Sequence, residues 1–377
     1  MTAAPNAHHV QPLYIVHTEA SCGWGGQEIR ILTEAAALTT RGHRVEVLCP
    51  QEAPLFTAAL DRQLPVCALP IGRKNLVGLK AVYRWLKSHR VDVINTHSST
   101  DSWLTALACR MLRNAPPIVR TRHISAAVSN NWPTRWLYQK AVSHIVTTGE
   151  QLRRQLIDVN HYLPTHVTSV PTGIDPLYYT PGDRVQARRR LGLDQDLTII
   201  GIVATLRSWK GHEYLINAFS RITGRNCQLA IVGDGPRREA IMALVKSLNI
   251  EDRVIMPGNQ RDVLPWLQAM DIFVLPSYAN EGVPQSIVQA MSCELPVITT
   301  PVGGIPEAIE PGRTGLIVEP RSIDALCGAL QEVISNIALR QRLGIAARKQ
   351  AQKNFTLTGM AEKMEQIFLN TRHSHEQ

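Results

Sequence analysis

Paired cysteine motifs and long apolar runs are both missing from this sequence. Its seven cysteines are an odd number, are scattered along the chain and include no C-x-x-C pair. This pattern is typical of reduced thiols in a cytosolic protein, and it argues against a disulfide framework or a zinc site. No apolar run approaches the ~18 residues that a membrane-spanning helix needs.

The start of the chain also lacks a secretion signature. The segment MTAAPNAHHVQPLYIVH has no basic n-region, and its apolar stretch is too short for the h-region of a signal peptide. We therefore expect a protein that is made and kept in the cytoplasm, either free or on the cytoplasmic face of the inner membrane.

Several catalytic signatures are absent as well. The sequence has no G-x-S-x-G, no G-x-x-x-x-G-K-[ST] and no H-E-x-x-H. Their absence excludes nucleophile-elbow hydrolases, P-loop nucleotide hydrolases and zincins. The only D-Q-D, formed by Asp194 and Asp196, precedes a predicted strand instead of following one. We interpret this pair as a capped surface turn and not as a metal site.

Basic residues are in excess, and most of the excess lies in the first half of the chain. Residues 1–175 contain 18 Lys and Arg against 11 Asp and Glu, whereas the remainder contains 22 against 20. Between Arg62 and Arg122, eleven basic residues face only Asp92 and Asp101. Such a patch indicates either an anionic partner or a solvated surface, and no nucleic-acid-binding motif accompanies it.

The order of the predicted elements is that of a two-domain α/β protein. The chain has 377 residues and 44% hydrophobic content, which suggests about two domains of ordinary size. Apolar strands alternate with helical segments, as in doubly wound parallel sheets. Residues 171–183 are rich in proline, glycine and tyrosine and interrupt the alternation. We expect domains at residues 1–175 and 176–355, followed by a closing helix at 356–377.

Polar residues stand where an open α/β sheet places its ligand-binding groups, at the carboxyl ends of strands. His97 and His123 each end a predicted strand of the first domain. Arg207 and Lys210 lie three residues apart at a strand-to-helix junction of the second domain. Fixed cations at such a junction would stabilise a leaving diphosphate without a metal ion.

The most informative stretch is residues 277–310, SYANEGVPQSIVQAMSCELPVITTPVGGIPEAIE. It carries Glu281 in a turn of small residues between a strand and a helix. The unpaired N–H groups of a helix N-terminus form a ready site for phosphate or for sugar hydroxyls. The glycines of a second turn, VGGIPE, let the backbone approach a ligand closely. The two turns would together form one wall of a pocket.

This stretch, the R-x-x-K-G at residues 207–211 and the histidine at 123 resemble the retaining glycosyltransferase family 4, whose fold is called GT-B. The family pattern is Glu, seven residues, Glu. Here the first is Glu281, but Gln289 stands at the second position, where an amide can still accept one hydrogen bond and donate another. A second departure is Glu294, where glycine is common. The resemblance implies two Rossmann-like domains with parallel sheets that face each other across a cleft, and a C-terminal helix that packs back on the N-terminal domain.

The resemblance also implies roles for residues. It assigns His123 and Glu281 to the reacting donor sugar, and Arg207 and Lys210 to the donor diphosphate. The remaining implied contacts are Gly25 and Gly26 for the diphosphate, and Gly282, Val283, Pro284, Gln285 and Gln289 for the sugar and nucleotide. No metal and no cofactor are expected, because the nucleotide sugar is a substrate.

The predicted activity is retaining transfer of a sugar from a nucleotide sugar to an acceptor hydroxyl, of the hexosyltransferase type (EC 2.4). Cell-surface polysaccharide, lipopolysaccharide or glycolipid assembly is the expected setting. Two alternatives stay open: a nucleotide-sugar epimerase of the same fold and, because of Gln289 and Glu294, a non-catalytic nucleotide-sugar-binding subunit. No motif fixes the sugar, the base or the acceptor.

A basic helix in the first domain indicates where the protein would encounter and bind its acceptor. Residues 75–90 are predicted to form a helix whose polar face carries Lys80, Arg84 and Lys87, with Trp85 beside them. A cationic face with an exposed aromatic is typical of an interfacial helix, although an ordinary surface helix has nearly the same composition. We expect peripheral contact with an anionic membrane, a lipid-linked or saccharide acceptor, and no nucleic acid.

Overall fold

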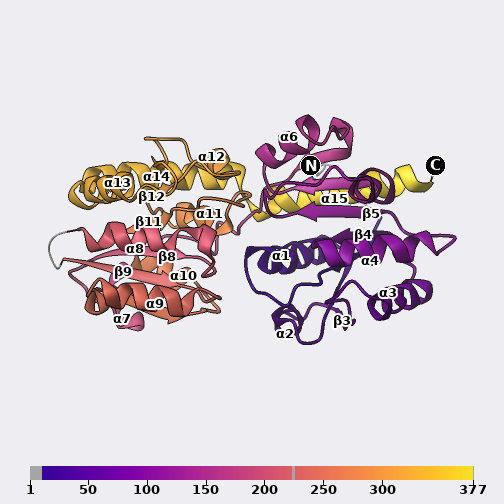
Figure 1. The fold of residues 1–377 in the computed structure, drawn as a ribbon, viewed down its shortest axis with the longest axis horizontal. Helices are drawn as coiled ribbons and strands as arrows, with labels where there is room; N and C mark the ends of the chain where they lie inside the picture. Colours follow the sequence, from indigo (N-terminus) through magenta and orange to yellow (C-terminus); the bar gives the residue numbers. More distant parts are fainter. Residues whose placement is uncertain (1–10, 223–225, 377) are drawn as a thin grey trace, which may run out of the picture.

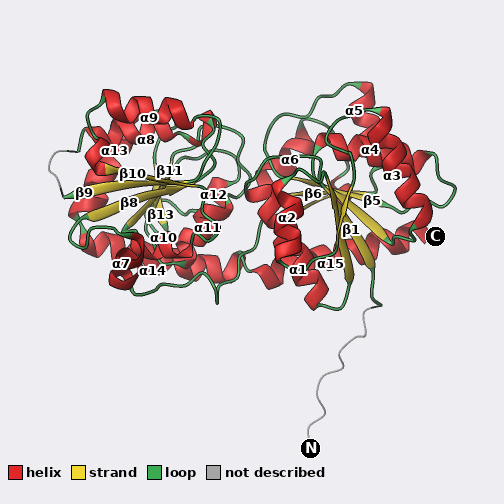
Figure 2. Ribbon diagram, turned by 90° about the horizontal axis from the view of Figure 1, so that it is seen from below, coloured by secondary structure: helices red, strands yellow, loops and turns green. Residues whose placement is uncertain are grey.

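The protein consists of two α/β halves and a long C-terminal helix, as seen in a computed structural model that describes residues 11–222 and 226–376 (Figure 1). Residues 1–10, which include much of the segment without a secretion signature, lie outside the described residues. The two halves lie side by side along the long axis of the molecule (Figure 1). Helices cover both faces of each sheet (Figure 2).

The N-terminal half is built on a seven-stranded parallel sheet with strand order β3-β2-β1-β4-β5-β6-β7. The strand order reverses between β1 and β4, and an open α/β sheet binds its ligands in the crevice at such a point. The strands are β1 (Tyr14–Thr18), β2 (Arg44–Cys49), β3 (Val66–Ala68), β4 (Val93–Thr96), β5 (Ile118–Arg122), β6 (His144–Thr147) and β7 (Val167–Ser169). The helices are α1 (Gly26–Thr40), α2 (Pro54–Asp61), α3 (Leu76–Ser88), α4 (Ser99–Arg110), α5 (Trp132–Trp136) and α6 (Glu150–Asp158).

The C-terminal half repeats this plan on a six-stranded parallel sheet with order β10-β9-β8-β11-β12-β13. Its order reverses between β8 and β11. The strands are β8 (Thr198–Val203), β9 (Cys227–Val232), β10 (Val254–Gly258), β11 (Ile272–Leu275), β12 (Val297–Thr299) and β13 (Gly315–Ile317). The helices are α7 (Arg184–Leu191), α8 (His212–Ser220), α9 (Arg238–Ser247), α10 (Leu264–Ala269), α11 (Gln285–Ser292), α12 (Ile305–Ala308), α13 (Ile323–Ser335) and α14 (Ile337–Asn354).

The central strands are apolar along their whole length because helices cover them on both sides. In β11, for example, all four residues of IFVL are buried. The buried residues of the C-terminal half form one hydrophobic cluster, and those of the N-terminal half form two, one on each face of the sheet. Each half therefore has a core of its own.

The last helix, α15 (Leu357–Glu376), returns to the N-terminal half and packs against α1 (Figure 1). Met364 and Phe368 on α15 are fully buried in the N-terminal core. At the edge of this contact, Glu365 accepts a hydrogen bond from Arg41 (Nε to Oε2, 3.1 Å) and pairs with His43 (Nε2 to Oε1, 2.7 Å). The predicted fold class, two parallel-sheet halves with a returning C-terminal helix, is confirmed.

The chain crosses between the halves twice, and the two crossings are joined to each other. Ile174 donates its N–H to the carbonyl of Phe355 (2.9 Å) and accepts the N–H of Leu357 (2.8 Å). Gly173 lies so close to the second crossing that a Cβ there would come within 2.3 Å of the Thr356 carbonyl oxygen. A side chain at position 173 would therefore push the two crossings apart.

The basic helix α3 differs from the prediction at its aromatic residue. Trp85 is buried and stacks on His89 with 4.1 Å between ring centroids, whereas Leu76 is 80% exposed. The reason is helical spacing: Trp85 falls on the buried face of α3 with Val82, while Leu76 stands four residues before Lys80, on the same face as Lys80 and Arg84. The outer face of α3 therefore has an aliphatic and not an aromatic residue beside its cations.

Two composition-based expectations have direct counterparts in the structure. None of the seven cysteines forms a disulfide bond. Over the ranges 11–222 and 226–376, no helix has the length and apolarity needed to cross a membrane.

Candidate active site

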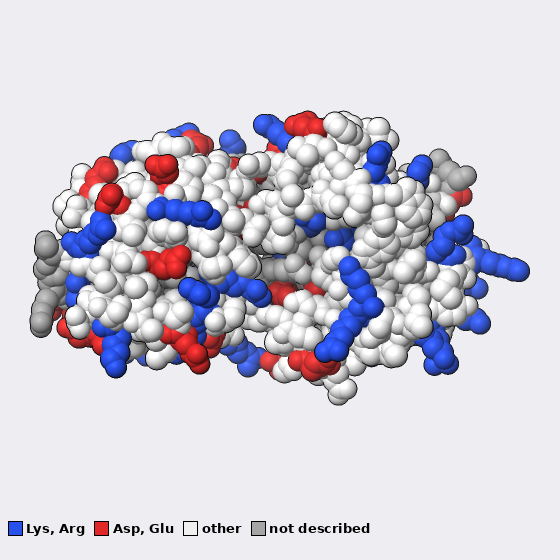
Figure 3. Space-filling model, in the orientation of Figure 1, with Lys and Arg blue, Asp and Glu red and all other residues white. Residues whose placement is uncertain are grey.

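The loops at the carboxyl ends of the two sheets meet each other. Val283, after β11, donates its N–H to the carbonyl of Thr148, after β6 (3.0 Å). The hydroxyl of Thr205, after β8, lies 3.4 Å from the carbonyl oxygen of Trp24, after β1. Glu307 on α12 accepts the backbone N–H groups at the start of α6, at 2.7 and 2.9 Å. The surface between the two halves is hollowed (Figure 3), and the strand-end loops that meet here include those predicted to bind the donor.

The predicted cation loop follows β8 and contains a short 3₁₀ turn, Ser208–Lys210. It ends at Gly211, whose φ is +78° and whose missing Cβ would come within 2.0 Å of the carbonyl oxygen of Pro276. Only glycine fits this position, because a side chain would be strained by the left-handed backbone and would collide with the strand end beside it. The glycine of the motif is thus needed to bring the loop against the end of β11.

The structure brings Lys210 and Glu281 together but not Arg207. The Nζ atom of Lys210 lies 2.7 and 3.0 Å from the two carboxylate oxygens of Glu281. Arg207 is exposed, and its guanidinium group lies 5.3 Å from the centre of the Trp209 ring. Lys210 and Glu281 therefore form an ion pair in the floor of the cleft, while Arg207 is free to turn toward an anion.

Glu281 is held by its neighbours as well as by Lys210. The side chain of Glu281 is 5% exposed, and the buried hydroxyl of Ser277 donates to its Oε1 at 2.6 Å. The two predicted turns touch: a Cβ on Gly303 would come within 1.9 Å of the Glu281 carbonyl oxygen, and a Cβ on Gly282 within 2.1 Å of the Thr148 hydroxyl. The acidic turn is thus fixed from both halves.

The predicted nucleotide segment forms the first turn of α11. This helix begins at Gln285, has Pro284 as its N-cap residue and has no side-chain cap. Across the cleft, a Cβ on Gly26 would lie 3.9 Å from the Gln285 side-chain oxygen, and a Cβ on Gly25 would lie 3.3 Å from the Thr205 hydroxyl. Gln289 is 4% exposed, one turn further into the helix. The uncapped N-terminus of α11 and the glycine turn after β1 therefore face the same space.

Glu294 lies at the other end of α11, away from this space. Its φ is +63°, the left-handed conformation in which helices commonly end, and this explains why glycine suits the position. A Cβ on Gly344 of α14 would come within 2.1 Å of the Glu294 carbonyl oxygen. Glu294 thus packs against α14 and does not line the rim of the cleft.

His123 is the first member of a chain of three histidines. Its Nε2 lies 2.9 Å from Nδ1 of His97, and Nε2 of His97 lies 2.9 Å from Nδ1 of His17. Burial lowers the pKa of His17 to about 3 and holds the pKa values of His97 and His123 well below the usual range. All three rings are therefore neutral at physiological pH. His123 is partly exposed, whereas the other two are buried.

Three residues that neighbour the predicted site are not identified by the sequence patterns. His17 lies inside β1 and not at its end, so the strand-end rule does not select it. Thr148 links the halves by accepting from Val283 with its carbonyl and donating its hydroxyl to the His123 carbonyl (3.2 Å). Glu19, directly after β1, accepts hydrogen bonds from Ser21 and Gln27, and burial raises its pKa to about 8. Of these three residues, Glu19 is the one that the strand-end rule could have identified, because it directly follows the first strand of a doubly wound sheet.

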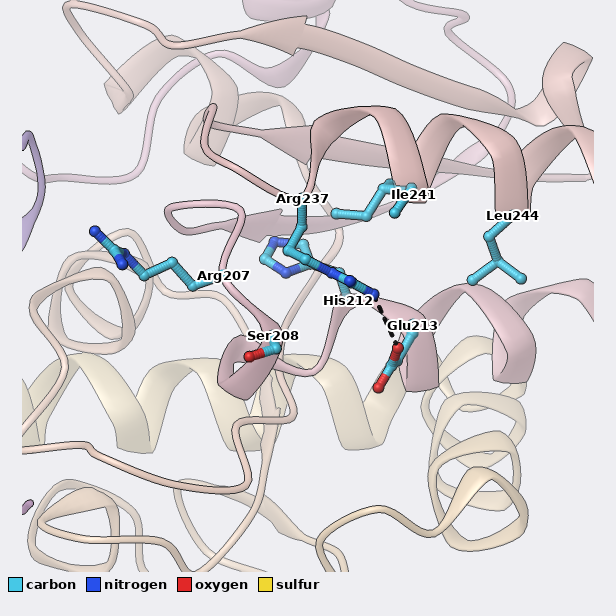
Figure 4. Close-up of a pocket in the computed structure, with 8 residues that line it drawn as sticks. Arg207, Ser208, His212, Glu213, Arg237, Ile241 and Leu244 are labelled. Carbon is cyan, nitrogen blue, oxygen red and sulfur yellow. Dashed lines mark ion pairs between the residues drawn. The ribbon is translucent and has the colours of Figure 1, made fainter.

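A pocket of about 220 Å³ lies beside the cation loop, between α8 and α9 (Figure 4). Arg237 and Glu213 form an ion pair at its mouth (3.7 Å), and Arg207 points away from that pair (Figure 4). The wall of the pocket includes His212. This side chain is buried, and burial lowers its pKa to about 3. The pocket borders the cation loop but contains neither Lys210 nor Glu281, so it lies next to the cleft and not within it.

Two doubly wound halves that meet at their strand ends define the GT-B class of fold, which solved glycosyltransferases share. The crystal structure of HepE from Anabaena in complex with UDP-glucose resembles this protein with a TM-score of 0.85. The likeness covers 95% of this chain and 100% of that chain, at 20% sequence identity.

The sequence comparisons place the chain in a family. The family described as "Glycosyltransferase Family 4" matches residues 24–177, and the one described as "Glycosyl transferases group 1" matches residues 183–350. The chain belongs to glycosyltransferase family 4, and it is a glycosyltransferase. It is 27% identical to D-inositol 3-phosphate glycosyltransferase from Corynebacterium diphtheriae over 91% of this chain and 89% of that protein. It is 28% identical to N-acetyl-alpha-D-glucosaminyl L-malate synthase from Bacillus anthracis over 74% of each.

Proposed function

We propose that the protein transfers a sugar from a nucleotide sugar to an acceptor hydroxyl with retention of anomeric configuration. The observation that carries the proposal is the Lys210–Glu281 pair at the point where the strand order of the second sheet reverses, between β8 and β11. The uncapped N-terminus of α11 lies next to it. This arrangement offers a cation and free N–H groups for a diphosphate and a carboxylate for the hydroxyls of the attached sugar.

In the proposed reaction the bond between the anomeric carbon and the diphosphate oxygen breaks, and the acceptor oxygen bonds to the same face of the sugar. The leaving phosphate oxygen takes the acceptor proton. The negative charge that develops on the diphosphate is stabilised by Lys210, Arg207 and the N–H groups of α11, so no metal is required. Glu281 suits a binding role better than a nucleophilic one, because Lys210 and Ser277 already occupy its carboxylate oxygens.

Release of free nucleoside diphosphate, measured with and without acceptor, tests this proposal against its alternatives. The purified protein is first screened for thermal stabilisation by UDP-, GDP- and ADP-sugars, since a ligand at 100 times its dissociation constant adds about 2.7 kcal/mol of stability. Release that depends on the acceptor is the expected result. Conversion of the sugar nucleotide without an acceptor would show an epimerase, and stabilisation without turnover would show a silent binding subunit.

We further propose that the acceptor is anionic and is met at a membrane surface, in surface polysaccharide, lipopolysaccharide or glycolipid assembly. Lys80, Arg84 and Lys87 are all exposed on α3, and Leu76 continues the same face with 80% exposure. Basic side chains project from the N-terminal half on the side where α3 lies (Figures 1 and 3). D-inositol 3-phosphate and L-malate, which occur in the names of the two relatives, are both anions with a hydroxyl group.

We expect the protein to co-sediment with anionic vesicles and to be released by salt. Each basic residue near such a surface contributes about 1 kcal/mol, and the attraction fades within a Debye length of about 10 Å at 0.1 M salt. The double variant Lys80→Ala, Lys87→Ala should therefore weaken vesicle partitioning by ~30-fold. Lys246→Ala, at an exposed lysine of α9 in the other half, is the matched control. Salt-insensitive partitioning, or turnover of a soluble acceptor without vesicle binding, would contradict membrane docking and leave the transferase activity standing.

A further inference from the structure

The three-histidine chain ends in a nitrogen that has nothing to bind. His17 is fully buried, and among the described residues its Nε2 has no hydrogen-bond partner. The ring of Phe368, on α15, stands edge-on to His17 with 6.5 Å between ring centroids. At the opposite end of the chain, His123 is partly exposed at the cleft. One end of the chain is therefore closed and apolar, and the other is open to a ligand.

Counting protons restricts the three-histidine chain to two arrangements of its N–H groups. Each neutral imidazole carries one N–H group, so the three rings share three protons. Each of the two contacts, His17 to His97 and His97 to His123, needs one proton between its facing nitrogens. The third proton must then lie at one end, either on Nε2 of His17 or on Nδ1 of His123.

The surroundings favour the open end. A proton on Nε2 of His17 would be a buried N–H group without an acceptor, which native structures rarely contain. A proton on Nδ1 of His123 can bond to water or to a substrate oxygen in the cleft. The polarity of both inner hydrogen bonds follows: His17 donates to His97, and His97 donates to His123.

We propose that His97 and His17 are positioning residues that fix the tautomer of His123, so that Nδ1 of His123 donates an N–H group to the donor sugar. This inference rests on the proposed function, in which His123 meets that sugar. His97 occupies Nε2 of His123 and keeps its ring in place, and His17 keeps His97 donating in that direction. His123 then enters the transfer as a neutral hydrogen-bond donor and not as a base.

His17→Met tests the proposal without touching the cleft. A thioether accepts a weak hydrogen bond but cannot donate one, so Nε2 of His97 would donate to the new sulfur, and Nδ1 of His97 would accept a hydrogen bond from Nε2 of His123. In the ring ¹⁵N NMR spectrum, His123 should carry its proton on Nδ1 in the wild type and shift toward Nε2 in the variant. Turnover should fall by ~10-fold with little change in KM for the donor, as when an interaction specific to the transition state is weakened.

Two further variants separate this role from a structural one. His97→Gln should preserve the polarity, because its amide oxygen can accept from His17 and its amide group can donate to His123; the His123 spectrum and most of the turnover should be retained. His144→Met removes another histidine of the same sheet, partly buried and bonded to Thr168 and not to the three-histidine chain, and serves as the control.

The ring spectrum decides the inference independently of activity. A bare Nδ1 on His123 in the wild type, or an unchanged His123 spectrum in His17→Met, would overturn it whatever the turnover. If the proton shifts as expected and turnover does not change, the chain fixes the tautomer but His123 has no part in the proposed transfer. The failure of the inference and the failure of the proposed function are therefore distinguishable.

Discussion

Arg207→Ala is expected to lower turnover by ~100-fold or more, as the loss of one preorganised electrostatic contact commonly does. Arg207 lies three residues before Lys210 on the same loop, and its exposed guanidinium group lies over the Trp209 ring. Its removal should therefore leave the melting temperature nearly unchanged. Steady-state kinetics with the donor identified by thermal shift, together with a melting curve, measure both effects.

Lys210→Ala should lower turnover by a similar factor but should also destabilise the fold. The structure shows why: the variant leaves the Glu281 carboxylate, 5% exposed, without its cation, and an uncompensated buried charge costs about 3–5 kcal/mol. Activity must therefore be compared well below the melting temperature. Arg221→Ala, at the other end of α8, removes an exposed arginine of the same half and is the control. Kinetics near those of the wild type in Arg207→Ala or Lys210→Ala would show that the substituted residue does not stabilise the donor diphosphate.

Glu281→Gln is expected to reduce turnover by ~100-fold or more. The amide keeps the size of the side chain and can still accept from Ser277, but it removes the negative charge beside Lys210 and replaces one acceptor oxygen by a donor. The loss should appear in kcat more than in the affinity for the nucleoside diphosphate, because the diphosphate contacts are retained. Melting curves show whether the fold is kept.

Gln289→Glu is the companion variant, because it restores the acidic pair of the family pattern on the same turn and helix. Gln289 is 4% exposed in the second turn of α11, four residues after Gln285 and so on the same face of the helix. A carboxylate there can accept from two ribose hydroxyls, so nucleotide binding should be kept or tightened. Abolished nucleotide binding in Gln289→Glu would show that this position does not bind the ribose. Unimpaired turnover in Glu281→Gln would contradict the role of Glu281.

The sequence by itself determined the two parallel-sheet halves and most of the segments that border the cleft. Apolar strands alternating with helical segments require helices on both faces of a sheet, and such a sheet collects its ligand-binding loops at the carboxyl ends of its strands. The K-G turn before α8 and the glycines beside Glu281 are local signals too, since their backbone conformation and close contacts exclude side chains. These signals place Lys210, Glu281 and His123 at strand ends, and the family resemblance then selects them as donor-site residues.

Only the tertiary structure decided which of these groups touch. The Lys210–Glu281 pair, the contact of Val283 with Thr148 and the place of His17 behind His97 join residues that lie far apart in the sequence. These contacts depend on strand order and on how the halves meet, which periodicity within a segment does not encode. Which face of a helix is buried also depends on tertiary packing. The composition of α3 predicts an exposed Trp85, but Trp85 is buried because the packing of α3 against its neighbours covers that face.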